Sequence, residues 1–153
     1  MKKILILGIG NEILQDEGVG IHVIRELAKE ALPEEVELLE GGTAGMELLP
    51  SLEGVDHLIV VDSIQAEDEP GSVFAFSPEE IKIFPDGCQV SAHQVGVFNL
   101  INSAALLDRL PPTKIIGIQP KEITWGLEMS PEVAKVVPKV VQLIHKEVEK
   151  LLN

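Results

Sequence analysis

The alternation of short apolar runs with longer segments of helical apolar spacing constrains the fold of this chain more than any other feature. Runs in which every residue is apolar suit strands that are buried on both faces of a sheet, and helices are the usual connections between parallel strands. The sequence therefore predicts an α/β fold, a three-layer sandwich with a mostly parallel, twisted sheet flanked by helices. The expected strands are 4–7, 36–39, 58–61 and 114–118, with a short strand at 73–76 on an edge.

Start and stop signals predict the helices between these strands. Ser and Thr are favoured as N-caps, and proline is tolerated in the first turn but kinks the interior of a helix. An acidic segment that contains Pro70, residues 65–71, is expected to form a surface loop. The expected helices are 19–31, a short one from a cap at Thr43 to Leu49, about 94–107 after a cap at Ser91, and a final one opened by Ser130-Pro131-Glu132 and kinked at Pro138.

Length, charge and cysteine content limit the class of protein. The 153 residues suit one domain over 1–153 with one sizeable core. A net charge of -13 would repel phosphate backbones, so nucleic acid is not an expected partner. Cys88 is the only cysteine, which excludes an internal disulfide and fits a reducing compartment. The apolar run 4–7 is too short for a signal peptide, and no run could span a bilayer. We therefore expect a cytoplasmic protein without a membrane partner.

Acidic side chains and one histidine follow the predicted strands. Asp16 and Glu17 come after the first strand, Glu40 follows the second, Asp62 follows the third, and His93 precedes a predicted helix. Ligands of parallel α/β sheets bind outside the carboxyl ends of the strands, so these groups should gather at one edge. Two carboxylates and an imidazole suit a partial shell for a divalent transition metal, or general acid–base catalysis. The alternative is structural: Asp16 and Glu17 precede a helix, whose dipole favours anions.

A glycine pattern suggests a different function. Gly8 and Gly10 after the first strand, with Glu40 at the end of the second, look like part of a dinucleotide-binding fingerprint. Ile13 stands where the third glycine belongs, and the loop continues through Gln15 before the helix begins. No helix N-terminus would then meet a pyrophosphate at the required place. A dinucleotide-binding module is thus the weaker alternative.

The remaining reactive or aromatic side chains lack partners in the sequence. Cys88 has no local motif and is expected to be dispensable, as Cys88→Ser with retained activity would show. His22, His57 and His145 are expected to pack or to face water, and Trp125 to lie in the core or at a rim. No serine or cysteine has a recognisable base partner, so no covalent acyl-enzyme is expected.

Four motifs resemble those of one enzyme family. The segment Leu7-Gly8-Ile9-Gly10-Asn11-Glu12-Ile13-Leu14-Gln15-Asp16-Glu17-Gly18-Val19-Gly20 is similar to the opening signature of the nickel–iron hydrogenase maturation endopeptidases. Gly41-Gly42-Thr43-Ala44-Gly45-Met46-Glu47-Leu48-Leu49 looks like the second signature of that family. Val61-Asp62-Ser63 and Ala92-His93-Gln94-Val95-Gly96 match its remaining metal-ligand positions.

The resemblance implies an activity, a partner and a metal. Enzymes of this family remove a C-terminal peptide from the large-subunit precursor of nickel–iron hydrogenases, and the nickel belongs to that substrate. The resemblance assigns metal contact to Glu17, Asp62 and His93. It also shows one departure: Glu40 stands where the family often has aspartate before Gly-Gly-Thr, so any role of Glu40 in cleavage or substrate positioning is open.

Two routes of cleavage are compatible with these residues. The metal could polarise the scissile carbonyl or activate water. Alternatively, the metal could serve only for recognition, with a carboxylate such as Asp16 or Glu17 as the base. Three donors, two of them oxygen, are fewer than the four protein ligands of a structural zinc site, so we expect the free protein to hold metal only weakly. A chaperone that docks the large subunit without cutting it is a further alternative.

Overall fold

A five-stranded sheet forms the middle layer of the described part of the chain, with strand order β2-β1-β3-β5-β4. The computed structural model describes residues 2–83 and 92–153, and only the backbone of 81–83 and 92–97. The first four strands in this order run parallel, and β4 pairs antiparallel with β5 at the edge. The predicted α/β sandwich, its mostly parallel sheet and its edge strand are thereby confirmed. The strands are β1 (Ile4–Ile9), β2 (Val36–Gly42), β3 (His57–Ser63), β4 (Val73–Phe76) and β5 (Thr113–Ile118).

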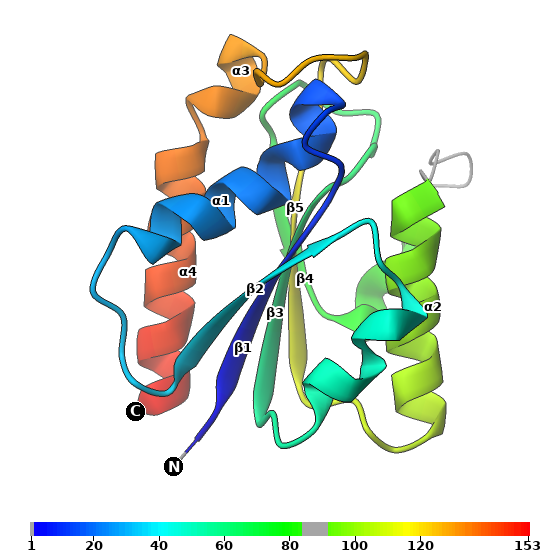
Figure 1. Ribbon diagram of the computed structural model, residues 1–153, viewed down its shortest axis with the longest axis vertical. Helices are drawn as coiled ribbons and strands as arrows, with labels where there is room; N and C mark the ends of the chain where they lie inside the picture. The colour runs from blue at the N-terminus through cyan, green and yellow to red at the C-terminus, as the bar shows by residue number, and fades with distance from the viewer. Residues whose placement is uncertain (1, 84–91) are drawn as a thin grey trace.

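Helices cover both faces of the sheet. Figure 1 shows α1 (Val19–Ala28) and α4 (Val137–Leu152) on one face, and α2 (Ala92–Leu106) with the 3₁₀ helix η2 (Met46–Leu52) on the other. The shorter helices are η1 (Gln15–Gly18), η3 (Pro78–Ile83) and α3 (Pro131–Ala134). Among the described residues, none of the helices combines the length and the apolar character that crossing a membrane requires.

Alternate residues of each strand belong to different halves of the core. Ile4 and Ile6 of β1 pack with α1 and α4, whereas Leu5 and Leu7 pack with α2 and η2. All four are at most 1% exposed, and burying such a side chain contributes about 1.5–3 kcal/mol. Strands that are apolar at every position are thus explained by a sheet with a helical layer on each face.

Several expected boundaries were wrong. The last helical segment is two helices, α3 and α4, and Pro138 lies in the first turn of α4 instead of kinking a longer helix. Ser130 precedes α3 but makes no side-chain cap bond. The short helix after β2 begins at Met46, with Gly45 and not Thr43 at its N-cap position. The first helix ends at Ala28, three residues before the expected end. Cys88 and the expected cap Ser91 lie outside the described residues.

Candidate active site

Two buried carboxylates lie where the parallel strands end. Asp62 is the penultimate residue of β3, and Glu17 belongs to η1, which packs against β3. Their exposed fractions are only 4% and 9%, respectively. Ser63 donates its backbone N–H to Oδ1 of Asp62 at 2.7 Å. Ionised carboxylates are rarely buried unless other groups satisfy them, so this pair is a candidate for function.

Gly10 allows the chain to fold back after β1 and to place Glu17. Its φ of 141° lies in a region that residues with a side chain rarely adopt. A Cβ at Gly10 would lie 1.9 Å from the backbone oxygen of Glu17, which leaves no space for any side chain. The glycine that resembled part of a dinucleotide fingerprint therefore has a different role here, since the 3₁₀ turn that carries Glu17 packs directly on it.

Gly20 brings the start of α1 onto the sheet. A Cβ at this position would lie 2.3 Å from the backbone oxygen of Val61 and 2.4 Å from that of Ile9. The first turn of α1 therefore rests directly on β1 and β3, next to Asp62. This close approach fixes η1, which immediately precedes α1, at the carboxyl ends of the strands.

The Asp16 carboxylate is fully buried and accepts four hydrogen bonds from one distant segment. Its Oδ2 accepts from the backbone N–H groups of Lys121 and Glu122 and from the Ser130 hydroxyl, each at 2.8 Å. Its Oδ1 accepts from the Ser130 backbone N–H at 2.7 Å. Hydrogen bonds of this kind, to a charged acceptor, are among the strong ones in proteins. They favour a structural role for Asp16, but one exerted on the segment 121–130 and not, as the sequence suggested, on the dipole of the following helix.

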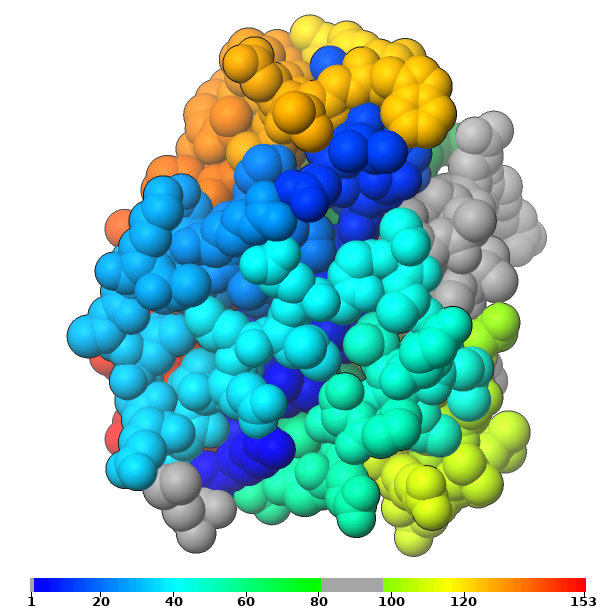
Figure 2. Space-filling view, in the orientation of Figure 1, coloured from blue at the N-terminus to red at the C-terminus, as the bar shows by residue number. Residues whose placement is uncertain are grey.

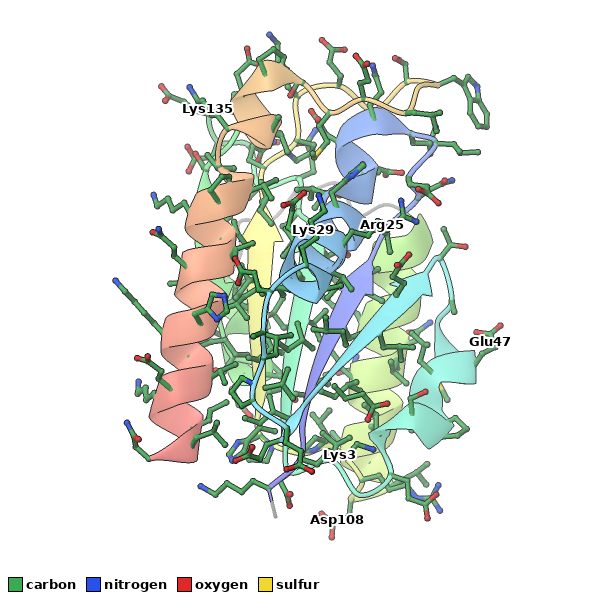
Figure 3. The ribbon with its side chains drawn as sticks, turned by 60° about the vertical axis from the view of Figure 1, so that its left-hand side comes forward. Lys3, Arg25, Lys29, Glu47, Asp108 and Lys135 are labelled. Carbon is green, nitrogen blue, oxygen red and sulfur yellow. The ribbon has the colours of Figure 1, made fainter. Side chains whose placement is uncertain are left out.

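Arg25 of α1 joins the loop after β1 to the end of β2. Its guanidinium contacts Glu12 at 2.7 Å and Glu40 at 3.0 Å, and Figure 3 shows its side chain near the end of the sheet where β1 and β2 finish. Hydrogen bonding and charge attraction from Arg25 lower the pKa of Glu12, and the two carboxylates raise the pKa of Arg25. Glu40, the residue that departs from the family pattern, is therefore an ion-pair partner.

A small cavity opens between the loop after β1 and the end of β2. It has a volume of about 250 Å³ and is lined on one side by 10–12 and on the other by Glu40, Gly42 and Thr43, with Ile21 of α1 beside them. Because η1 packs against Gly10, the cavity lies beside the segment that carries Glu17. Carboxylates of Glu12 and Glu40 give its wall a negative charge, which the single guanidinium of Arg25 offsets only in part.

His93 is placed by its backbone alone. It is the second residue of α2, which begins at the end of the molecule where the parallel strands finish (Figure 1). Within the part of the chain whose side chains are described, no three His, Cys, Asp or Glu residues gather around a possible metal position, and the His93 side chain is outside that part. The structure thus packs η1, which carries Glu17, against β3, which carries Asp62, and the assignment of Glu17, Asp62 and His93 as metal ligands stays a prediction.

Two other histidines lie in a separate cavity. A cavity of about 470 Å³ between α1 and α4 is lined by His22, Glu30 and His145 among others. His145 forms an ion pair with Glu30. Nε2 of His22 is buried and has no hydrogen-bond partner among the described residues. Burial, and then the charge of Arg25, lower the pKa of His22. As expected, these histidines pack on the helices and do not belong to the strand-end site.

Two features of the site escaped the sequence analysis. The segment 121–130, which holds Asp16, has no motif that predicts a link to a residue more than a hundred positions earlier. Arg25 was missed because a lone arginine in an amphipathic helix usually faces water. A weak signal was available in the sequence, because Arg25 lies on the first helix, between the loop that carries Glu12 and the strand end that carries Glu40.

Comparison with known proteins identifies the family. The model of the hydrogenase maturation proteases matches residues 21–147. The hydrogenase expression/formation protein HupD of Bradyrhizobium diazoefficiens is 37% identical over 144 residues, which are 92% of this chain and 75% of that protein. The hydrogenase 2 maturation protease of Escherichia coli is 33% identical over 147 residues, which are 93% of this chain and 88% of that protein.

Solved structures agree with these relatives. The hydrogenase-maturating endopeptidase HybD from E. coli has a TM-score of 0.88 at 29% identity, over 97% of this chain and 93% of that one. The hydrogenase maturation protease HybD from Thermococcus kodakarensis has a TM-score of 0.79 at 34% identity, over 94% of this chain and 97% of that one. The fold and the matched sequences define a protein-cleaving hydrolase. The chain belongs to the hydrogenase maturation protease family. A maturation protease is therefore favoured over a dinucleotide-binding module as the interpretation of the sequence.

Proposed function

We propose that this protein removes the C-terminal extension of a [NiFe] hydrogenase large-subunit precursor that already carries nickel. The observation that carries the proposal is the pair of buried carboxylates, Glu17 and Asp62, at the carboxyl end of a parallel sheet. The helix that bears His93 begins at the same end (Figure 1). The names of the relatives from B. diazoefficiens and E. coli point to the same hydrogenase chemistry.

In this proposal Glu17, Asp62 and His93 contact the nickel of the bound precursor. Carboxylate oxygens and neutral imidazole nitrogen are suitable donors for this ion. The substrate's nickel offers a Lewis acid close to the scissile peptide bond. Three side chains leave coordination positions for donors of the precursor, so recognition depends on a metal that the precursor brings.

The proposal assigns different duties to the two neighbouring acidic residues. Asp16 already accepts four hydrogen bonds from the segment 121–130 and is fully buried, so it has little capacity left to take a proton from water. Glu17, which packs at the end of β3, is the better candidate for a general base if the nickel serves only for recognition. The proposal places the reaction in the cytoplasm, because a chain with Cys88 as its single cysteine suits a reducing compartment.

The test is mass spectrometry of nickel-loaded precursor after incubation with the protein. The proposed function predicts one new, shorter large subunit and one released C-terminal peptide. Glu17→Gln and Asp62→Asn should stay folded and lose cleavage, whereas Glu149→Gln, which removes one exposed charge near the C-terminal end of α4, should cleave normally. Binding of the precursor without any shortening by the unaltered protein would identify a chaperone and overturn the proposal.

A further inference from the structure

Exposed apolar side chains gather beside the candidate site. Trp125 is 77% exposed and Leu127 67%, and Ile13 and Ile123 are also among the exposed large apolar residues. Their two segments are joined by backbone hydrogen bonds, from Gln15 to the oxygen of Gly126 at 3.0 Å and from Gly126 to the oxygen of Ile13 at 2.9 Å. We call these four side chains, Ile13, Ile123, Trp125 and Leu127, the apolar rim.

The apolar rim is held in place by the residue next to Glu17. The Asp16 carboxylate accepts hydrogen bonds from the backbone N–H groups of Lys121 and Glu122 at one end of the segment 121–130. At the other end it accepts from the backbone N–H and the hydroxyl of Ser130. The backbone N–H of Asp16 also donates to the oxygen of Glu122 at 2.9 Å. Figure 2 shows this segment, in yellow to orange, lying against the blue residues 11–17 at one end of the molecule. A surface fixed in this way loses little conformational entropy when a partner binds.

Tryptophan exposed to this degree is unusual on a free protein surface. Clusters of exposed apolar residues with polar surroundings mark interaction sites, and tryptophan is enriched among the residues that dominate binding energy. The surroundings here are acidic: Glu12, Glu122 and Glu128 lie on the same two segments, and all three are part of the exposed or half-buried surface. Glu12 is paired with Arg25, and the cation of Lys121 is paired with Glu132 at 3.1 Å.

We infer that the apolar rim docks the precursor, through an apolar segment of the precursor that is flanked by lysine or arginine. The inference rests on the proposed function, because it names the surface that presents the precursor to Glu17. The rim is continuous with the site through Asp16. Its acidic border attracts basic groups, and a net charge of -13 on each chain opposes a second copy as the occupant. The rim binds the folded precursor, and Glu17 and Asp62 meet its nickel.

The experiment measures cleavage of nickel-loaded precursor at a series of precursor concentrations. Trp125→Ala should raise KM by about 30-fold, as expected for the loss of one dominant contact, with kcat changed less than about two-fold. The matched control is Leu106→Ala, which truncates an apolar side chain of 88% exposure. Leu106 lies two residues before Asp108, at the far end of the molecule from the rim (Figure 3). This variant should keep the KM of the unaltered protein.

A second measurement separates docking from chemistry. In a Glu17→Gln background, which should bind without cutting, Trp125→Ala should weaken precursor binding by the same factor, and binding should weaken further as salt screens the acidic border. An unchanged KM and unchanged binding in Trp125→Ala would overturn the inference while cleavage by the unaltered protein upheld the proposed function. A fall in kcat without a change in KM would also overturn it. If the unaltered protein cuts no precursor, the proposed function fails and the inference fails with it.

Discussion

Replacing Asp16 by asparagine should destabilise the fold, because no orientation of the amide satisfies all four donors. One side-chain oxygen accepts from Lys121, Glu122 and the Ser130 hydroxyl, and the other accepts from the Ser130 backbone N–H. The amide nitrogen of asparagine is a donor, so on whichever side it lies, at least one backbone N–H loses its acceptor: either the buried one of Ser130 or the part-buried ones of Lys121 and Glu122. That loss costs about 1–3 kcal/mol, and the bonds that remain lose their charge assistance.

The expected loss for Asp16→Asn is about 3 kcal/mol in the free energy of unfolding. For a chain of this size that corresponds to a Tm lower by roughly 6–12 °C. Thermal and urea unfolding measure both quantities. The control is Glu122→Gln, which removes the same charge from an exposed side chain of the same segment and should change stability by less than about 0.5 kcal/mol. An Asp16→Asn protein with unaltered Tm and abolished cleavage would refute this reasoning and make Asp16 a base.

Two further predictions concern the loop after β1 and the cavity between α1 and α4. Gly10→Ala should lower the free energy of unfolding, measured in urea, by more than about 2 kcal/mol, because the added Cβ would meet the backbone of Glu17. The control is Gly54→Ala: Gly54 also has a positive φ, but the space around it is open, so this change should cost about 1 kcal/mol. The lowered pKa of His22 means that the folded protein binds a proton there less readily than the unfolded chain. The contribution of His22 to stability is therefore present above pH 6.5 and is lost as the pH falls below that value. His22→Gln should flatten the decline of Tm between pH 7 and 5. An unchanged slope of Tm against pH would contradict this prediction.

The strands could be predicted because their signal is local. A run such as 58–61, apolar at every position, fits either a buried strand or a segment of a buried helix. Its short length and its β-branched residues indicate a strand. The structure extends this strand to His57–Ser63, which makes Asp62 part of the strand and not of the loop after it. Polar residues at a strand end look like loop in a sequence, although here they continue the hydrogen bonding of the sheet.

The end of the chain shows where local signals fail. Ser130-Pro131 marks a helix start correctly. The Ser130 hydroxyl, however, donates its hydrogen bond to Asp16, 114 residues away, and does not cap the helix. Pro138 is equally compatible with a kink and with the first turn of a new helix, and the apolar spacing continues across it. Only the packing of α3 and α4 distinguishes the two, so the break between them could not be predicted.

The site was predictable in position but not in the division of roles. The predicted parallel strands and the rule on carboxyl ends suffice to place Glu17 and Asp62 at one edge. Asp16 and Glu17 are adjacent acidic residues, and only the family resemblance, not their local sequence, distinguishes them. In a 3₁₀ helix, which has three residues per turn, neighbouring side chains diverge by about 120°. Asp16 therefore binds the segment 121–130, while η1, which also carries Glu17, packs against β3.

Cleavage of nickel-loaded and nickel-free precursor by the same metal-stripped protein tests the central claim most directly. The protein is first dialysed against a mild chelator and its metal content is determined by elemental analysis. If Glu17, Asp62 and His93 form an incomplete shell that waits for the substrate's metal, the stripped protein should hold no stoichiometric nickel or zinc and should still cut the loaded precursor. It should leave the nickel-free precursor intact. Equal cleavage of both precursors, or stoichiometric metal that survives the chelator, would contradict the account.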